Sequence, residues 1–511
     1  MKKIKLLFLF VALIPCYQSL SAGGILTNTN QNVAFLRSPA RDAAIGIDGV
    51  YTNPAGVVFM DNGVHVSFNW QYAHQTRTIT TTNPDFASGV SNGGQTVKTF
   101  KGIADAPVIP SLQIAYNKDR WSFQGAIAVT GGGGKCEFDK GIGSFESAIS
   151  AIASRLQPLG VTGYQADSYM RGKQYYFGFT LGSAYKINEQ LSVYGGLRLL
   201  YGTASYKAKV DNIQVNTANG LVPFGGFIDG ANVTIATNLA KVEGGIQQIQ
   251  AGIAQYQAAG VTPPAELTKQ LASLQATQAQ LQTTQQSMAA LELYRDGINM
   301  MSDQTGVGIA PIIGIDYKTG NWNFAAKYEF KTRMRMKNSS TVKEAHVISA
   351  INKYLDGTSV PEDQPALFTA GAQWSILPTV RVNVGYHLFF DKSAHWYNHE
   401  EDKLDDNTWE VNGGVEWDVT DKLQVSGGIQ KTNYGLSDAY MNDMSFVVSS
   451  YTFGFGLGYQ LTKKVKVNVA YFQTNYGTYK QEVTPTDLNH TTHNDYTRTN
   501  KVFGVGVDLT L

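Results

Sequence analysis

The feature that most constrains this chain is an apolar residue at every second position, repeated over most of the sequence. At the C-terminus, for example, Val507, Leu509 and Leu511 alternate with Asp508 and Thr510. A period of two predicts β-strands that are apolar on one face and polar on the other. Fourteen such segments can be counted after about residue 62.

The connections between these segments alternate strictly between short and long. The short ones are 117–120, 186–190, 318–321, 377–379, 420–422 and 462–464. The long ones are 74–106, 131–172, 206–304, 336–364, 391–407, 431–446 and 474–499. Outer-membrane barrels have this asymmetry, because their periplasmic turns are short and their outer loops are long. A Greek-key sandwich has no reason to sort its loops in this way.

Composition supports a membrane barrel. Charged residues make up only 16% of the chain, against roughly 25% in an average soluble protein. The 41 basic and 40 acidic side chains nearly balance, so no bulk attraction to nucleic acid is expected. Strands can cross hydrocarbon only as a closed ring. We therefore predict an all-β fold, a fourteen-stranded antiparallel transmembrane β-barrel over 62–511.

The N-terminus has the pattern of a secretory signal peptide. Lys2, Lys3 and Lys5 precede the apolar run 6–14, and small residues lead to a predicted cleavage after Ala22. Cys16 could instead be a lipid attachment site, but Pro15 before it matches that processing signal poorly. Removal of residues 1–22 leaves Cys136 as the only thiol, so no internal disulfide is expected.

Residues 23–61 precede the first strand and lack its alternation. They contain Asp42-Ala43-Ala44, Asp48 and the tetrapeptide Asn53-Pro54-Ala55-Gly56, and they begin beside Ala22-Gly23. In these residues and in its fourteen strands, the chain resembles the FadL/TodX family of outer-membrane channels for long-chain fatty acids and aromatic hydrocarbons.

The resemblance implies an N-terminal hatch inside the barrel and a passive route for hydrophobic ligands. The hatch residues it implies are Asp48, Asn53, Pro54, Ala55 and Gly56. Ligand would pass from an outer groove to an inner pocket and leave sideways where the third strand kinks. That strand is predicted at 121–130, and Gly125, Gly131 and Gly132 are its candidate gate residues, since glycine allows a sharp bend. The alternative is that the glycine run 131–134 only begins a flexible loop.

The inward face of the strands carries the polar and charged residues of the lumen. These are Asn323, Lys327, Glu329, Lys331, Arg333 and Arg335 on one strand, with Arg198, Arg381, His387, Glu410 and Glu416 on others. Arg198, Lys327, Arg333 and Arg381 are the candidate contacts for a ligand carboxylate. The alternative for each is a place in a structural network of ion pairs.

Two further segments have distinctive residue patterns. The heptad-spaced apolar residues within 240–295 predict two antiparallel helices outside the membrane. His395 and His399 lie four apart near Glu400 and Glu401, but no helix supports that spacing, so no metal site is predicted. No catalytic motif is found, and no enzyme activity or cofactor is predicted.

The predicted function is passive uptake of hydrophobic small molecules, such as long-chain fatty acids, across the outer membrane of a Gram-negative bacterium. The expected partners are the ligand, outer-membrane lipid, lipopolysaccharide and the barrel-assembly machinery, with the chain itself a monomer. Two alternatives stay open. The barrel could act as an adhesin or assembly surface through its long loops, or as a general porin.

Overall fold

The structure is a computed structural model that describes residues 25–344, 349–444, 446–484 and 490–511. The predicted signal peptide, residues 1–22, lies outside the described residues. No helix in the described ranges is long and apolar enough to cross a membrane.

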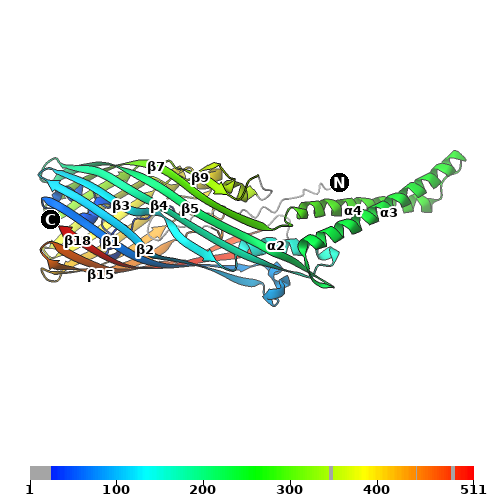
Figure 1. Cartoon of the computed structure of the whole chain (residues 1–511), viewed down its shortest axis with the longest axis horizontal. Helices are drawn as coiled ribbons and strands as arrows, with labels where there is room; N and C mark the ends of the chain where they lie inside the picture. Colours follow the sequence, from blue (N-terminus) through cyan, green and yellow to red (C-terminus); the bar gives the residue numbers. More distant parts are fainter. Residues whose placement is uncertain (1–24, 345–348, 445, 485–489) are drawn as a thin grey trace.

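Fourteen antiparallel strands close into one ring (Figure 1), so the predicted barrel is confirmed. Closure is made by the first and last strands, which pair from His65 with Thr510 to Thr82 with His493. The ring strands are β1 (Gly63–Thr82), β2 (Val97–Lys118), β3 (Trp121–Phe138), β4 (Gly163–Lys186), β5 (Leu191–Thr217), β7 (Ile298–Thr319), β8 (Trp322–Glu329), β11 (Leu367–Leu377), β12 (Val380–Phe389), β13 (Thr408–Asp418), β14 (Leu423–Asn433), β15 (Ser450–Thr462), β16 (Val465–Tyr476) and β18 (Thr492–Thr510).

Four shorter segments extend this ring at its outer end. One of them, β6 (Gly220–Pro223), pairs with β5. The other three continue the ladders of β8, β11 and β16, in this order: β9 (Arg335–Ser340), β10 (Ser359–Pro361) and β17 (Tyr479–Val483). Strands also run further into the predicted long connections than expected. For example, β1 continues to Thr82 and β2 begins at Val97, and both positions lie within the predicted loop 74–106.

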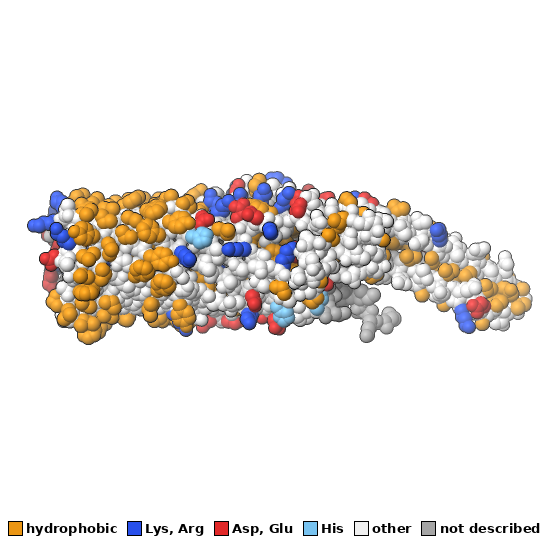
Figure 2. Space-filling model, turned by 90° about the horizontal axis from the view of Figure 1, so that it is seen from below, with side chains coloured by type: hydrophobic (Ala, Val, Ile, Leu, Met, Phe, Trp, Pro, Cys, Tyr) orange, Lys and Arg blue, Asp and Glu red, His pale blue; other side chains and the backbone are white. Residues whose placement is uncertain are grey.

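The outside of the barrel is apolar over the half that carries the short turns. Phe68 is 55% exposed, whereas its neighbours Ser67 and Asn69 are fully buried on the inside. Figure 2 shows the exposed apolar side chains gathered at the end away from the projecting helices. Trp322 stacks on Trp374 across neighbouring strands at this end. An apolar belt edged by aromatic residues around a polar interior is the surface of an outer-membrane barrel.

The helices lie inside the barrel or beyond its outer end. Within the N-terminal segment they are α1 (Val33–Arg37), η1 (Ile47–Val50) and η2 (Gly56–Phe59). The outer connections hold η3 (Pro84–Ser88), η4 (Val90–Asn92), α2 (Gly143–Arg155), η5 (Gln157–Leu159), α3 (Phe224–Ala258), α4 (Ala265–Glu292), η6 (Ser349–Tyr354), η7 (Asp391–Ser393) and η8 (Tyr397–Lys403).

Helices α3 and α4 form an antiparallel hairpin that projects from the end opposite the C-terminus (Figure 1). The hairpin begins at Phe224, earlier than the predicted 240. Its turn contains Gly260, whose φ of 70° is in the left-handed region, followed by Pro263 and Pro264. Gln278 on α4 donates a hydrogen bond to Glu243 on α3 at 3.3 Å.

Candidate functional site: the lumen and the break between β2 and β3

The pairing between β2 and β3 is interrupted. It runs from Lys118 with Trp121 to Ser111 with Ala128 and then resumes only at Ile103 with Glu137. Residues 104–110 of β2 and 129–136 of β3 therefore have no ladder between them, and we call this interval the β2–β3 break. Its inner end lies beside Ile127 and Val108, which are exposed on the apolar belt.

On its other side β3 keeps pairing with β4 but changes register twice, next to Gly131. Gly132 and Gly134 have φ values of 89° and 70°, which side chains other than glycine rarely adopt. A Cβ on Gly131 would lie 2.3 Å from the carbonyl oxygen of Leu26. The glycine run thus lets β3 change register beside β4 and lets the N-terminal segment approach it closely.

The N-terminal segment pairs with the edge of β3 that β2 leaves. Thr27 forms an antiparallel bridge with Gly131, and the Asn28 N–H donates to the Thr130 carbonyl at 2.9 Å. The Gln31 carbonyl accepts from Gln113 of β2 at 3.0 Å. These bonds satisfy backbone and side-chain groups that a missing ladder would otherwise leave unpaired.

The structure places the three predicted gate residues differently. Gly131 and Gly132 lie at the break. Gly125 lies below it, where β3 pairs regularly with Ile114 on β2 and Leu181 on β4, so Gly125 takes no part in the break. The strand also runs on to Phe138 instead of ending at 130.

Residues 25–61 are buried almost throughout. Ile25 and Leu26 pack against side chains of the outer connections, and the rest of the segment fills the inner half of the barrel. The predicted tetrapeptide meets three strands there. Asn53 donates to Asp316 of β7 at 2.6 Å, the Pro54 carbonyl accepts from Gln124 of β3 at 2.8 Å, and the Ala55 carbonyl accepts from Ser192 of β5 at 2.7 Å. A Cβ on Gly56 would lie 2.4 Å from the Asn53 side chain, which explains the glycine.

Two of the predicted basic residues are held in ion pairs beneath this segment. Arg198 and Lys327 both bind Glu329, and the Lys327 ammonium lies 2.7 Å from Glu329. The same ammonium donates to the Tyr51 carbonyl at 2.7 Å and lies 4.5 Å from the centre of its ring. Arg198 and Lys327 therefore hold the N-terminal segment in place.

A second network anchors the other side of the segment. Arg41 binds Asp48 at 2.8 Å and Glu416 of β13 at 2.6 Å, with all three side chains buried. Arg381 forms an ion pair with Asp418 at 2.7 Å near the short turns. Breaking a buried ion pair by removing one partner typically costs about 3–5 kcal/mol. This network therefore fixes Asp48 and the segment to the wall.

His387 forms a third anchor that the sequence analysis did not connect to the N-terminal segment. Its ring bridges Glu410 of β13 at 2.8 Å and Asp42 at 2.9 Å. The alternation of β12 and β13 predicted that His387 and Glu410 face inward. Their partner Asp42 lies far away in the sequence, so no local signal could have found it.

The prediction that Arg333 faces the lumen is wrong. Between Glu329 and Lys337 the chain has one residue more than the facing part of β7, so the alternation reverses. Arg333 is exposed on the outer face, and its neighbours Met334 and Met336 are buried instead. Lys331 and Arg335 are likewise not buried in the lumen.

A large apolar cluster lies in the outer half of the barrel interior and continues to the base of the α3–α4 hairpin. We call its buried side chains the outer apolar cluster. It contains Phe100, Cys136 and Phe138 near the break, and it includes the methionines Met170, Met288, Met300, Met334, Met336, Met441 and Met444. Methionine side chains are flexible and fill irregular spaces. Such a cluster can adapt to apolar molecules of different shape.

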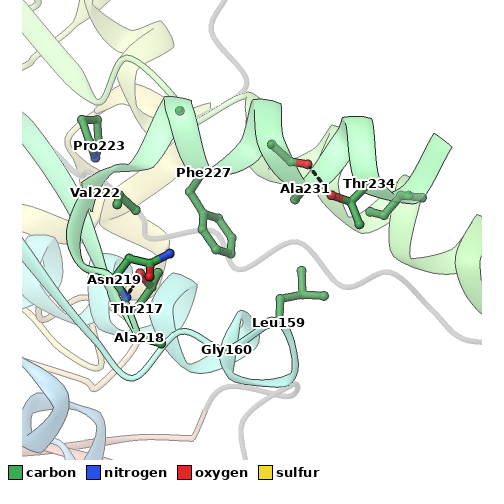
Figure 3. A pocket seen from close by; sticks show the side chains of 13 residues that line it. Leu159, Gly160, Thr217, Ala218, Asn219, Val222, Pro223, Phe227, Ala231 and Thr234 are labelled. Carbon is green, nitrogen blue, oxygen red and sulfur yellow. Dashed lines mark hydrogen bonds between the residues drawn. The ribbon is translucent and has the colours of Figure 1, made fainter. Parts of the chain in front are cut away.

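A pocket of about 700 Å³ lies at the base of the α3–α4 hairpin, outside the barrel. Phe227 of α3 and Leu159 both point into it, and Val222 and Ile235 add further apolar lining (Figure 3). It lies between two outer connections, at the end of the barrel that carries the hairpin.

Known structures share this architecture. A FadL homologue of Pseudomonas aeruginosa superposes with a TM-score of 0.57, covering 96% of this chain and 100% of the other at 12% identity. The toluene transporter TodX of Pseudomonas putida gives 0.51, covering 96% and 99% at 12% identity. A TodX mutant, a monoaromatic hydrocarbon channel, gives 0.52 at 13% identity, covering 94% and 99%.

No protein-family model and no curated protein sequence matches the chain. At this identity the superpositions establish the fold, and they confirm the fourteen-stranded barrel that the resemblance implied. The chain therefore has the fold of the FadL and TodX outer-membrane channels.

Proposed function

We propose that the chain is a passive channel that takes hydrophobic small molecules up across the outer membrane and releases them sideways through the β2–β3 break. The break carries this proposal, because a continuous ladder would give an apolar molecule no way through the wall. The likeness in fold to a toluene transporter supports the same class of ligand. Burial of roughly 0.8 kcal/mol per methylene supplies affinity without a cofactor.

In this proposal the N-terminal segment 25–61 acts as the hatch. Its networks around Glu329 and Glu416 fill the inner half of the lumen with charged and polar groups, which an apolar ligand would have to desolvate to pass straight through. The sideways route requires less desolvation of charged and polar groups. Ile109 on β2 lies at the break and packs against the buried apolar cluster that includes Val33 and Leu36.

The same proposal includes the oligomeric state and the membrane environment of the barrel. It works as a monomer whose apolar belt contacts outer-membrane lipid and lipopolysaccharide, after insertion by the barrel-assembly machinery. The pocket below Phe227 would then be a first collecting site for ligand, and the outer apolar cluster would be the second.

We further propose that a carboxylate headgroup binds between Arg77 and Arg498. These two arginines face each other across β1 and β18, and both are buried. A carboxylate accepts charged hydrogen bonds from guanidinium groups, and two arginines on the same face can share it. Arg77 lies 5.7 Å from the ring centre of Phe446, a member of the outer apolar cluster, where the tail would lie. This arrangement supports long-chain fatty acids within the broader class.

Replacing Arg77 or Arg498 with Gln is expected to raise the Kd for a long-chain fatty acid by about tenfold or more, since a charged hydrogen bond contributes about 1.5–3 kcal/mol. The measurement is displacement of a fluorescent fatty-acid probe from purified protein in detergent. Arg333→Gln, on the outer face, is the matched control and should bind normally. Unchanged fatty-acid affinity in both variants, together with uptake of toluene, would instead favour neutral hydrocarbons.

The projecting hairpin is the one observation that favours a second function, attachment through the outer surface. Replacing residues 241–279 with a short Gly-Ser linker removes the outer part of the hairpin, including the contact between Glu243 and Gln278, and keeps its base. We expect uptake of hydrophobic ligand to stay within about twofold of the wild type, since the hairpin lies outside the lumen. Loss of cell or partner attachment with normal uptake would show that the hairpin is an adhesive surface.

A further inference from the structure

Three side chains that commonly bind metals converge in the outer connection between β12 and β13. The Nδ1 atoms of His395 and His399 lie 3.4 Å and 3.3 Å from Oε1 of Glu401. The two imidazole ring centres are 5.1 Å apart. In the described parts of the chain, this is the one group of three such residues whose ligand atoms all lie within 4.8 Å of one another.

An unusual backbone conformation brings these residues together. Asn398 and His399 have φ values of 56° and 52°, both in the left-handed region. Few residues other than glycine adopt this conformation, and two in succession reverse the chain sharply. The reversal brings His399 back beside His395 without the helix that a spacing of four would otherwise need.

The distances fit a tetrahedral metal ion. Zinc binds imidazole nitrogen and carboxylate oxygen at about 2.0–2.1 Å, which places neighbouring tetrahedral ligands about 3.3–3.4 Å apart. The two nitrogen-to-oxygen distances at Glu401 have this value. Two histidines and one glutamate also form a recurrent set of zinc ligands that leaves a fourth position for water.

The carboxylate of Glu401 is oriented for this role. Its Oε2 accepts the N–H of Trp396 at 3.0 Å, which directs Oε1 towards the two imidazoles. Glu401 is only 4% exposed, and no lysine or arginine in the described ranges forms an ion pair with it. A buried carboxylate needs a compensating charge, and outer-shell hydrogen bonds of this kind fix metal ligands.

We propose that His395, His399 and Glu401 bind one Zn²⁺ ion, which stabilises the fold of the outer connection 391–407. This connection already contacts its neighbour, because Asp363 donates its N–H to the His395 carbonyl at 3.2 Å and Trp396 donates its ring N–H to the Asp363 carbonyl at 2.9 Å. The ion joins the two sides of the chain reversal at Asn398.

The test is calorimetric titration of ZnCl₂ into the whole barrel, purified in detergent without a polyhistidine tag and stripped with EDTA. We expect one ion per chain, and no binding of MgCl₂ or CaCl₂ at the same concentrations, since those ions prefer oxygen ligands. His399→Ala and Glu401→Gln should each weaken zinc binding at least about 100-fold. The double variant His490→Ala/His493→Ala removes two histidines from another outer connection and should bind normally.

Absence of stoichiometric zinc binding to the wild type would overturn the proposal. So would wild-type affinity in His399→Ala, whose exposed side chain makes misfolding of this variant improbable. X-ray absorption of the zinc-loaded wild type gives an independent readout and should show two imidazole ligands. A spectrum without imidazole scattering would equally exclude the site.

Discussion

Deleting Gly132 and Gly133 is expected to reduce uptake of hydrophobic ligand at least about tenfold while leaving a folded barrel. Between the pairs Val129–Phe177 and Gly134–Gln174, β3 has two residues more than β4. Their removal would restore a regular register with β4 and shorten the part of β3 that leaves β2, so that β3 lies along β2 with a mismatch of one residue between the pairs Ser111–Ala128 and Ile103–Glu137. A continuous ladder leaves no path through the wall, because each backbone group is then bonded within the sheet. Uptake of labelled fatty acid or toluene by cells expressing the variant measures the effect.

The matched control for this deletion removes Gly260 and Val261 from the turn of the helical hairpin, where two fewer residues leave the lumen and the break unchanged. Folding of both variants is checked by the shift in gel mobility between unheated and heated samples, which reports an intact barrel. If the Gly132–Gly133 deletion folds and still takes up ligand at the wild-type rate, the break is not the exit.

Removing residues 25–61 is expected to convert the barrel into an open pore. These residues fill the inner lumen, and their anchors at Glu329, Glu416 and His387 are on strands of the wall, so the ring itself stays bonded. Without the segment, the remaining charged side chains line a water-filled lumen through which ions can pass. Single-channel conductance in planar bilayers should rise from near the baseline of the wild type to the level of an open barrel.

The variant with residues 241–279 replaced is the matched control for that experiment, because it lacks a segment of similar length outside the lumen. Its conductance should equal that of the wild type. Equal conductance with and without residues 25–61 would contradict the hatch and favour a general porin.

Much of the wall could be predicted from sequence, because the signal for it is local. The alternation around Phe68, with Ser67 and Asn69 on the other face, requires only that a strand separates lipid from the lumen. Beyond the apolar belt this signal ends. Arg77 and Arg498 are in predicted loops but lie on strands of the structure, since polar residues on both faces give no alternation to detect.

The position of Arg333 shows how one residue changes such a prediction. The extra residue lies between Glu329 and Lys337, in a stretch that begins beside Pro311. The Pro311 carbonyl accepts the Phe330 N–H at 3.0 Å, but proline has no N–H to donate in return. The ladder is interrupted there, and every side chain beyond it changes face. A proline on one strand and an insertion on its neighbour become related only when the strands pair.

The sequence by itself determined the barrel, the number of its strands and the two kinds of connection, because each depends on residues close together in the chain. Only the tertiary structure decided where β2 leaves β3, what fills the gap and which charges pair in the lumen. Asp42 and His387 are 345 residues apart, and Thr27 meets Gly131 only inside the closed ring. Such contacts depend on how the whole chain closes, and no local pattern specifies them.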